Sequence, residues 1–241
     1  MILIRQEDIL HKFQLLKVLT EIVDNHPLSS NVYFKGGTCA TMLGYLDRFS
    51  VDLDFDLKKN ANKLKLLPEF KKIFKKLDLK VEKGDSKNLL FVLKYDAPKD
   101  QRNTLKLSIA DVFVEANEYK AFFLAEIDRM VICQTIGTMF ANKLVAPIDR
   151  YNKHEKIAGR DIYDIHHFFS KGYTFKKEII EERMKMSAED YIKKLIRFIE
   201  EKMTDRVLTE DLNMLLPYDI FLRVRKTLKP ETLIFLRSVV K

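Results

Sequence analysis

The stretch Phe34–Leu57, FKGGTCATMLGYLDRFSVDLDFDL, combines a glycine pair with a run of alternating carboxylates. From Val51 to Leu57 apolar and acidic residues alternate strictly, and this period of two predicts a half-buried β-strand. One face of the strand is apolar, and the other carries Asp52, Asp54 and Asp56. Carboxylates on one strand face repel each other unless cations neutralise them, so the pattern favours a divalent metal site.

The glycine pair Gly36-Gly37 lies between two predicted elements. The apolar run Val32–Phe34 precedes it as a short strand, and helical spacing over Thr38–Leu46 follows it. A strand, a glycine turn and a helix start leave backbone N–H groups free to bind phosphate oxygens. A glycine pair before a helix is usually only a turn, but together with the acidic strand it indicates a phosphate-binding loop beside a metal site.

The composition is that of an ordered protein, with 46% hydrophobic and 11% aromatic residues among 241. The formal net charge of +8 attracts polyanions and mildly favours nucleic acid or nucleotides as partners. Lysines are dense between Lys58 and Lys87. They form either a solvated helix face or a path for a polyanion, and we favour the solvated face.

Cysteine usage and the N-terminus indicate where the protein acts. Cys39 and Cys133 belong to no CxxC or Cys/His cluster, so neither a structural zinc nor a disulfide framework is expected. The pair His166-His167 lacks an HExxH context and is not expected to bind metal. The N-terminus lacks the order of a signal peptide, and no apolar run is long enough to span a membrane. We expect a soluble cytoplasmic protein.

The remaining periodicity predicts an N-terminal α/β part and a C-terminal helical part in close contact. We place their boundary after residue 115, because the character changes to helix beyond Glu115. Tight turns between three short strands favour an antiparallel extension of the sheet. The three strands cover 79–82, 89–95 and 104–114. Predicted helices cover 6–24, 139–150 and 160–170. Pro68 opens another helix, Ser187 caps a further one, and Thr209 and Pro230 open two short helical segments.

Walker, Rossmann and Gly-x-Ser-x-Gly motifs do not occur, but several other motifs occur in a defined order. The order GG-T, R-x-S, D-L-D-F, K-L-x-A and R-D-x-Y-D resembles the AbiEii/AbiGii-type nucleotidyltransferases. These are toxins of bacterial abortive-infection and toxin–antitoxin systems, within the polymerase-beta-like superfamily. The matching positions, all between Phe34 and Phe168, are Gly36, Gly37, Thr38, Arg48, Ser50, Asp52, Asp54, Phe55, Lys143, Leu144, Ala146, Arg160, Asp161, Tyr163 and Asp164.

The resemblance implies an α+β fold, with a nucleotidyltransferase-type mixed sheet over residues 1–115 and a helical domain over 116–241 that contributes to the active-site cleft. It implies that Asp52 and Asp54 hold one or two Mg²⁺ ions on an NTP. An acceptor hydroxyl would attack the α-phosphate, and pyrophosphate would leave. The implied acceptor is RNA, such as a tRNA end, or a protein, and a cognate antitoxin is an implied partner.

The other matching residues receive roles in the same way. Lys143 would neutralise phosphate charge, and Asp161 or Asp164 would orient Lys143 or the nucleotide. The implied nucleotide-binding residues are Gly36, Gly37, Thr38, Arg48 and Ser50. The alternatives are a surface arginine at position 48 and a turn cap at position 50.

The sequence departs from the family pattern at one position. The third carboxylate expected after a K-[LI] pair is replaced by Ser108. Asp111 or Asp56 could substitute for it, although we expect Asp56 to be an extra charge on the surface or behind the metal ligands. Otherwise one metal and Lys143 suffice, or the chain is a degenerate nucleotidyltransferase fold that binds nucleotide or RNA without chemistry. Transfer to a small molecule ranks last, because no acceptor pocket is indicated.

Overall fold

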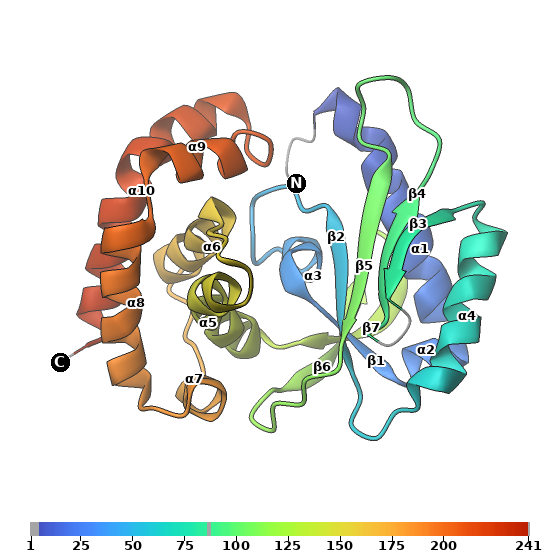
Figure 1. The fold of residues 1–241 in the computed structure, drawn as a ribbon, viewed down its shortest axis with the longest axis horizontal. Helices are drawn as coiled ribbons and strands as arrows, with labels where there is room; N and C mark the ends of the chain where they lie inside the picture. Colours follow the sequence, from blue (N-terminus) through green and yellow to red (C-terminus); the bar gives the residue numbers. More distant parts are fainter. Residues whose placement is uncertain (1–4, 86–87, 241) are drawn as a thin grey trace. The chain divides into compact units, whose positions relative to one another are not determined.

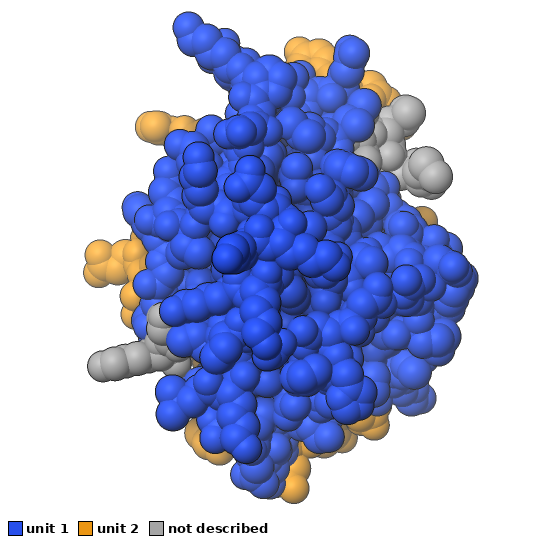
Figure 2. All heavy atoms as spheres, turned by 90° about the vertical axis from the view of Figure 1, so that its right-hand side faces the viewer, with its two compact units in different colours: residues 1–113, 119–134 blue, residues 114–118, 135–241 orange. Residues whose placement is uncertain are grey.

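The computed structural model describes residues 5–85 and 88–240, and its elements group into two units (Figure 2). The sequence predicts a single boundary, after residue 115. In the structure the chain leaves the first unit and re-enters it before the helical part begins. Unit 1 comprises residues 1–113 and 119–134, and unit 2 comprises residues 114–118 and 135–241.

The strands of unit 1 are β1 (Val32–Lys35), β2 (Asp52–Leu57), β3 (Lys80–Asp85), β4 (Leu90–Lys94), β5 (Thr104–Ala110), β6 (Tyr119–Leu124) and β7 (Arg129–Gln134). They form one seven-stranded sheet in the order β3-β4-β5-β2-β1-β7-β6. β2 pairs parallel with β5 and antiparallel with β1, and β1 pairs parallel with β7. The predicted α+β class with a mixed sheet is confirmed, as is the antiparallel extension through β4 and β3.

Strand β2 shows the alternation that its sequence predicts. Leu53 and Phe55 are buried, with exposed fractions of 0% and 1%, while Asp52 and Asp54 occupy the opposite face. Burying each such apolar side chain contributes about 1.5–3 kcal/mol. A slip of one residue would exchange the two faces and bring carboxylates into the core, so burial holds the register.

The helices of unit 1 are α1 (Ile9–Asp24), α2 (His26–Ser29), α3 (Gly36–Met42) and α4 (Lys63–Lys76), and a 3₁₀ turn over Gln6–Asp8 precedes α1. Figure 1 shows α1, α2 and α4 on one side of the sheet and α3 on the other. Phe70 and Phe74 of α4 pack against Phe91 of β4. The apolar face of the sheet therefore lies under α1 and α4, and the acidic face of β2 lies on the side of α3.

The helices of unit 2 are α5 (Ile136–His154), α6 (Gly159–Ser170), α7 (Lys177–Met184), α8 (Ala188–Lys202), α9 (Asp205–Leu212) and α10 (Tyr218–Ser238). Phe140 of α5 packs edge-on against Phe168 of α6, and Tyr191 of α8 donates a hydrogen bond to the main-chain oxygen of Leu144. Ser187 caps α8 as predicted, because its hydroxyl accepts from the N–H of Asp190 at 3.1 Å. Among the described residues, no helix combines the length and apolar character that a membrane span requires.

The hairpin β6–β7 corrects the prediction that helical character begins beyond Glu115. Val131 and Cys133 are buried while Met130 and Ile132 are exposed, which is the period of a strand. The apolar run of β7, residues 130–133, is only four residues long, and such runs cannot be assigned to helix or strand from periodicity alone.

Three predicted helix starts are also wrong. Pro68 lies inside α4, which begins after Asn62, whose side chain accepts a backbone N–H of the first turn. Pro230 lies inside the continuous helix α10. Thr209 lies inside α9, and Thr204 caps that helix instead. Proline is common at a helix start, but a helix that packs along its length can retain an internal one.

Candidate active site

The glycine loop of unit 1, Gly36-Gly37, follows β1 directly and forms the first two residues of α3, against the acidic face of β2. Gly36 has a φ of +81°, which other residues rarely adopt. A Cβ built on Gly36 would lie 2.6 Å from Oδ2 of Asp54, closer than real Cβ atoms approach. Glycine is therefore required at this position both by the backbone conformation and by the nearby carboxylate.

The second glycine lies against two other residues of the predicted nucleotide site. A Cβ on Gly37 would lie 2.8 Å from Oγ of Ser50 and 3.0 Å from Nη2 of Arg48. The hydroxyl of Thr38 lies 2.9 Å from Oγ of Ser50 and donates to the main-chain oxygen of Asp52 at 2.5 Å. The structure thus brings together the glycine loop, Arg48, Ser50 and the start of the acidic strand.

Arg48 is not a surface arginine. Its exposed fraction is 3%, and Nη1 donates to the main-chain oxygen of Phe49 at 2.9 Å. The hydroxyl of Thr41 in α3 donates to the main-chain oxygen of Arg48 at 3.1 Å. These bonds tie the connection between α3 and β2 back onto the helix and place a buried positive charge beside the glycine loop.

Asp54 is held from one side and faces the glycine loop on the other. Oγ of Ser108 donates to Oδ1 of Asp54 at 2.6 Å, because the two residues are directly paired between the parallel strands β2 and β5. Oδ2 of Asp54 is the oxygen that lies beside Gly36. The position predicted for a third carboxylate therefore holds a hydroxyl that is hydrogen-bonded to the second one.

Two other carboxylates were considered as replacements, and each has its own partners. Asp111 follows the end of β5, forms an ion pair with Lys63, and has a side chain that is 53% exposed. Asp56 is 3% exposed, which excludes the expected surface charge and leaves the other expectation, a charge behind the metal ligands. It accepts from Lys35 at 2.5 Å, from Gln134 at 2.6 Å and from the hydroxyl of Tyr119 at 2.9 Å. Hydrogen bonds occupy both oxygens of Asp56.

The donor set determines which kind of metal site the chain could form. Among the residues that the structure describes, no group of three or more His, Cys, Asp or Glu side chains could hold a metal ion. Asp52 and Asp54 supply two carboxylates beside a loop that can approach phosphates. Mg²⁺ is usually bound by one or two carboxylates together with substrate phosphates and water. The residues present therefore fit an ion that arrives with a nucleotide, and do not fit an all-protein cage.

Unit 2 brings together the other three predicted catalytic residues. Nζ of Lys143 on α5 lies 2.7 Å from Oδ2 of Asp164 and 3.7 Å from Oδ1 of Asp161, both on α6. The exposed fractions of the two carboxylates are 0% for Asp164 and 1% for Asp161. Nε of Arg150 lies 3.0 Å from the other oxygen of Asp161. Two buried carboxylates are thus compensated by two cations, as buried charges require. We call these four residues, Lys143, Arg150, Asp161 and Asp164, the Lys143 cluster.

Four residues in these networks were not predicted from the sequence: Arg150, Lys35, Tyr119 and Gln134. For Arg150 a signal was available, because it follows Lys143 by seven residues and so lies on the same side of one helix. The three partners of Asp56 come from β1, β6 and β7, and sequence spacing does not reveal such contacts.

A family model described as "Nucleotidyl transferase AbiEii toxin, Type IV TA system" matches residues 17–222 of the chain. The chain belongs to this family. The match confirms the resemblance inferred from the motifs, and it includes both the glycine loop with the acidic strand of unit 1 and the Lys143 cluster of unit 2. A search of curated protein sequences gave no match.

Solved structures share the fold of this AbiEii family chain. A Helicobacter pylori protein described as a nucleotidyltransferase superposes with a TM-score of 0.59 at 23% identity, covering 98% of this chain and 95% of that one. JHP933 from Helicobacter pylori gives a TM-score of 0.56 at 22% identity, covering 98% and 94%. MenT4, a nucleotidyltransferase toxin from Mycobacterium tuberculosis, gives 0.54 at 17% identity, covering 97% and 85%. At these identities the similarity establishes the fold alone.

Proposed function

We propose that the chain transfers NMP from an NTP to an acceptor hydroxyl on RNA, such as a tRNA end, and acts in this way as a toxin. One observation carries the proposal: the loop at Gly36 approaches Asp54 so closely that no Cβ fits between them. Backbone N–H groups of this turn, together with Asp52 and Asp54, would form the arrangement that a metal-bound triphosphate needs. Membership of a toxin family supports the biological role.

In the proposed reaction the oxygen of the acceptor hydroxyl forms a bond to the α-phosphorus, and the hydroxyl proton passes to water. The bond from that phosphorus to the oxygen that bridges the α- and β-phosphates breaks, and pyrophosphate leaves. The loop at Gly36 and Gly37 would hold the outer phosphates, with the buried Arg48 adding positive charge beside them. Asp52 and Asp54 would hold Mg²⁺. When bound, the ion would neutralise charge on the phosphates and polarise the phosphoryl oxygens.

The Lys143 cluster has a role in the same proposal. The ammonium of Lys143 would neutralise phosphate charge, since it keeps a side-chain exposure of 19% while its carboxylate partners are buried. Asp164, at 2.7 Å, would orient the ammonium, and Asp161 would support it while bound to Arg150. A cognate antitoxin and a cytoplasmic location belong to this proposal through the type IV toxin–antitoxin description of the family.

The test is label transfer from each of the four α-labelled NTPs in the presence of Mg²⁺, with total cellular RNA and total protein as separate acceptors. Asp54→Ala should abolish labelling. Asp111→Ala is the matched control, because it removes an exposed carboxylate of the same unit and should leave labelling within about twofold. The proposal is wrong if wild-type protein labels no RNA, or if Asp54→Ala labels RNA as well as wild type does.

A second candidate is a degenerate fold that binds nucleotide or RNA without chemistry. The observation that favours it is the hydroxyl of Ser108 at 2.6 Å from Asp54, where a third carboxylate was expected to act as base. Calorimetry would separate the two candidates. NTP binding without turnover across RNA and protein acceptors would support the degenerate fold, and turnover would exclude it.

A further inference from the structure

The sheet face that carries the candidate metal ligands continues outward over three more strands. Asp52 of β2 is paired with Lys106 of β5, Lys106 with Val92 of β4, and Val92 with Lys83 of β3. Directly paired residues on neighbouring strands lie on the same face of the sheet. A row of side chains therefore leads from Asp52 to the edge of the sheet, on the same face as the carboxylates.

Two further rows flank the first. One runs from Asp54 through Ser108 and Leu90 to Asp85 of β3, and the other pairs Thr104 with Lys94 and Lys94 with Lys80. The intervening residues Phe91, Leu93, Leu105 and Leu107 point the other way and are buried, on the side where Figure 1 shows α1 and α4. We call the opposite set the lysine face: the exposed Lys80, Lys83, Lys94 and Lys106, with the exposed Leu90 and the half-buried Val92 between them.

The charges of the lysine face are poorly compensated. Lys80, Lys83 and Lys106 are exposed and form no ion pair with any residue in the described part of the chain. Lys94 lies 3.5 Å from Glu82, with both side chains more than 40% exposed, and such pairs contribute little. Lys80 is paired directly with Lys94, and like charges in this position destabilise a sheet. Asp85, which accepts hydrogen bonds from Asn88, is the carboxylate of β3 that the pairing places on this face. Four lysines on the same three strands outnumber it, so the face carries an excess of positive charge at a cost in stability.

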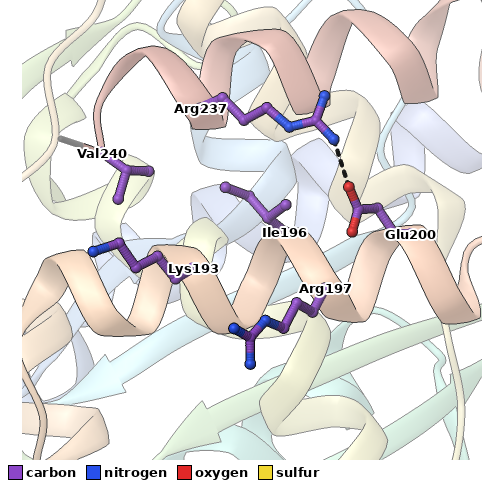
Figure 3. A pocket seen from close by; sticks show the side chains of 6 residues that line it. All are labelled: Lys193, Ile196, Arg197, Glu200, Arg237 and Val240. Atoms are coloured by element: carbon purple, nitrogen blue, oxygen red, sulfur yellow. Dashed lines mark hydrogen bonds and ion pairs between the residues drawn. The ribbon is translucent and has the colours of Figure 1, made fainter.

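A groove of about 340 Å³ lies between α8 and α10 of unit 2, and its charges are better compensated than those of the lysine face (Figure 3). Figure 3 shows Arg237 directed at Glu200, and the two form an ion pair at 2.5 Å. Lys193 forms another with Glu189 at 2.7 Å. Most cations of this groove are neutralised by neighbouring carboxylates, so it is less suited to a polyanion than the lysine face.

We propose that the lysine face binds the phosphates of the acceptor RNA and leads the strand away from the reacting end. The inference rests on the proposed transfer to RNA and names the surface that holds this acceptor. Strands in a sheet are about 4.8 Å apart, so Lys106 and Lys83 lie about 10 Å apart along the row that begins at Asp52. Lysines on both sides of Leu90 and Val92 can bind phosphates, while these apolar side chains give a base a surface to contact.

The test measures binding of a short fluorescent single-stranded RNA to the full chain by anisotropy over a range of salt concentrations. The triple variant Lys83→Gln, Lys94→Gln, Lys106→Gln removes three charges from the lysine face. The control variant Lys65→Gln, Lys71→Gln, Lys75→Gln removes three from exposed positions of α4, with the same change in net charge. Thermal unfolding of each variant checks that it is folded, and all six substitutions are at exposed positions.

The lysine-face variant should bind about tenfold more weakly or worse, and its log–log salt slope should fall by about two, since each lost phosphate contact on a single strand removes about 0.7. The α4 variant should stay within about twofold of wild type. Equal weakening in the two variants would show diffuse attraction, and unchanged binding in the lysine-face variant would show that RNA lies elsewhere. Either result overturns the inference.

Label transfer by the same proteins separates this inference from the proposed function. If wild type labels RNA and the lysine-face variant binds and labels it equally well, the inference fails while the function stands. If wild type labels only protein, the function as proposed fails, and unchanged RNA affinity in the lysine-face variant would overturn the inference as well. If wild type labels nothing but the lysine-face variant alone loses RNA affinity, the surface is supported without the chemistry.

Discussion

Asp54 and Asp56 lie two residues apart on one face of β2, and their surroundings are opposite. Asp56 is 3% exposed and accepts hydrogen bonds from an ammonium, an amide and a phenol. Asp54 accepts one hydrogen bond from Ser108 and directs its other oxygen at the glycine loop. Identical residues in a repeating pattern thus have different tasks. The carboxylate with all its partners within the fold stabilises unit 1, and the one with an oxygen directed at the loop can bind a ligand.

The Lys143 cluster of unit 2 combines features of both. Asp164 is completely buried, like Asp56, but the ammonium that neutralises it is 19% exposed and so can still contact a solute. Burial of a carboxylate alone therefore does not decide its task. What decides it is whether the carboxylate, or the cation paired with it, keeps a group that can contact a ligand.

The largest effect is expected on stability, from Asp56→Ala. Removing this carboxylate leaves Lys35, whose side chain is 24% exposed, without its partner in a largely buried site. Breaking a buried pair in this way costs about 3–5 kcal/mol of the free energy of unfolding. Urea unfolding would measure it, with Asp111→Ala as the control, because that carboxylate is exposed and should change stability by less than about 1 kcal/mol. If the two variants are equally stable, the Asp56 network does not hold the fold together.

At Asp54 a substitution is expected to reduce activity and to leave stability almost unchanged. Asp54→Asn keeps the size of the side chain and should change the free energy of unfolding by less than about 1 kcal/mol, because an amide oxygen can still accept from Ser108. NMP transfer should fall by about 100-fold to 1,000-fold, since the amide lacks the charge that holds the metal and its phosphates. A variant that keeps full transfer, or that unfolds like Asp56→Ala, would remove the distinction between the two carboxylates.

His11, which contacts the residue just before β2, should make the free energy of unfolding of unit 1 depend on pH. Nε2 of His11 donates to the main-chain oxygen of Val51 at 2.9 Å, and burial lowers the pKa of His11 from 6.5 to about 4. The unfolded chain then takes up a proton that the folded chain rejects. The stability due to neutral His11 is fully present above about pH 6.5 and is lost as the pH falls toward about 4, by about 3 kcal/mol in total.

Urea unfolding of wild type and His11→Gln at about pH 7.5 and about pH 5 would check this. Glutamine can donate to Val51 but does not titrate, so wild type should lose about 2 kcal/mol more than the variant over this interval. Equal losses in the two proteins would show that the pKa of His11 is the same in the folded and unfolded states, and would contradict the effect expected from its burial.

The sequence predicted the local part of this site well. Strict alternation predicted β2, and the glycine pair predicted the turn from β1 into α3, because each depends on residues close together in the chain. The predicted bounds of that helix were wrong, because it covers Gly36–Met42 and not Thr38–Leu46. The internal helix prolines were misjudged for the opposite reason. Whether Pro68 or Pro230 interrupts a helix depends on the packing on both sides of it, and local preference cannot show that packing.

The burial of Asp56 could not have been predicted in this way. Its donors Lys35, Tyr119 and Gln134 come from β1, β6 and β7, and β6 and β7 were expected to be helical. Without that hairpin Asp56 lacks two of its three donors, so a surface position remained one of the two expectations for it. The same limit applies to the lysine face, which depends on the pairing of β3, β4 and β5 rather than on any motif.

The smallest effect is expected at Ser108, and it tests the boundary between the two kinds of carboxylate. Ser108→Ala removes the one hydrogen bond that Asp54 receives through Oδ1, and a hydrogen bond to a charged group contributes about 1.5–3 kcal/mol at most. Because water can replace the lost hydrogen bond to Asp54, transfer should fall by about tenfold or less, with little change in NTP affinity measured by calorimetry.

Ser108→Thr is the matched control, since it keeps the hydroxyl and should retain most of the transfer. If Ser108→Ala instead abolishes transfer while Ser108→Thr retains it, the hydroxyl takes part in the chemistry and Ser108 is more than a support for Asp54. If Ser108→Ala has no effect on transfer at all, Asp54 does not need that hydrogen bond, and the difference between Asp54 and Asp56 rests on the glycine loop alone.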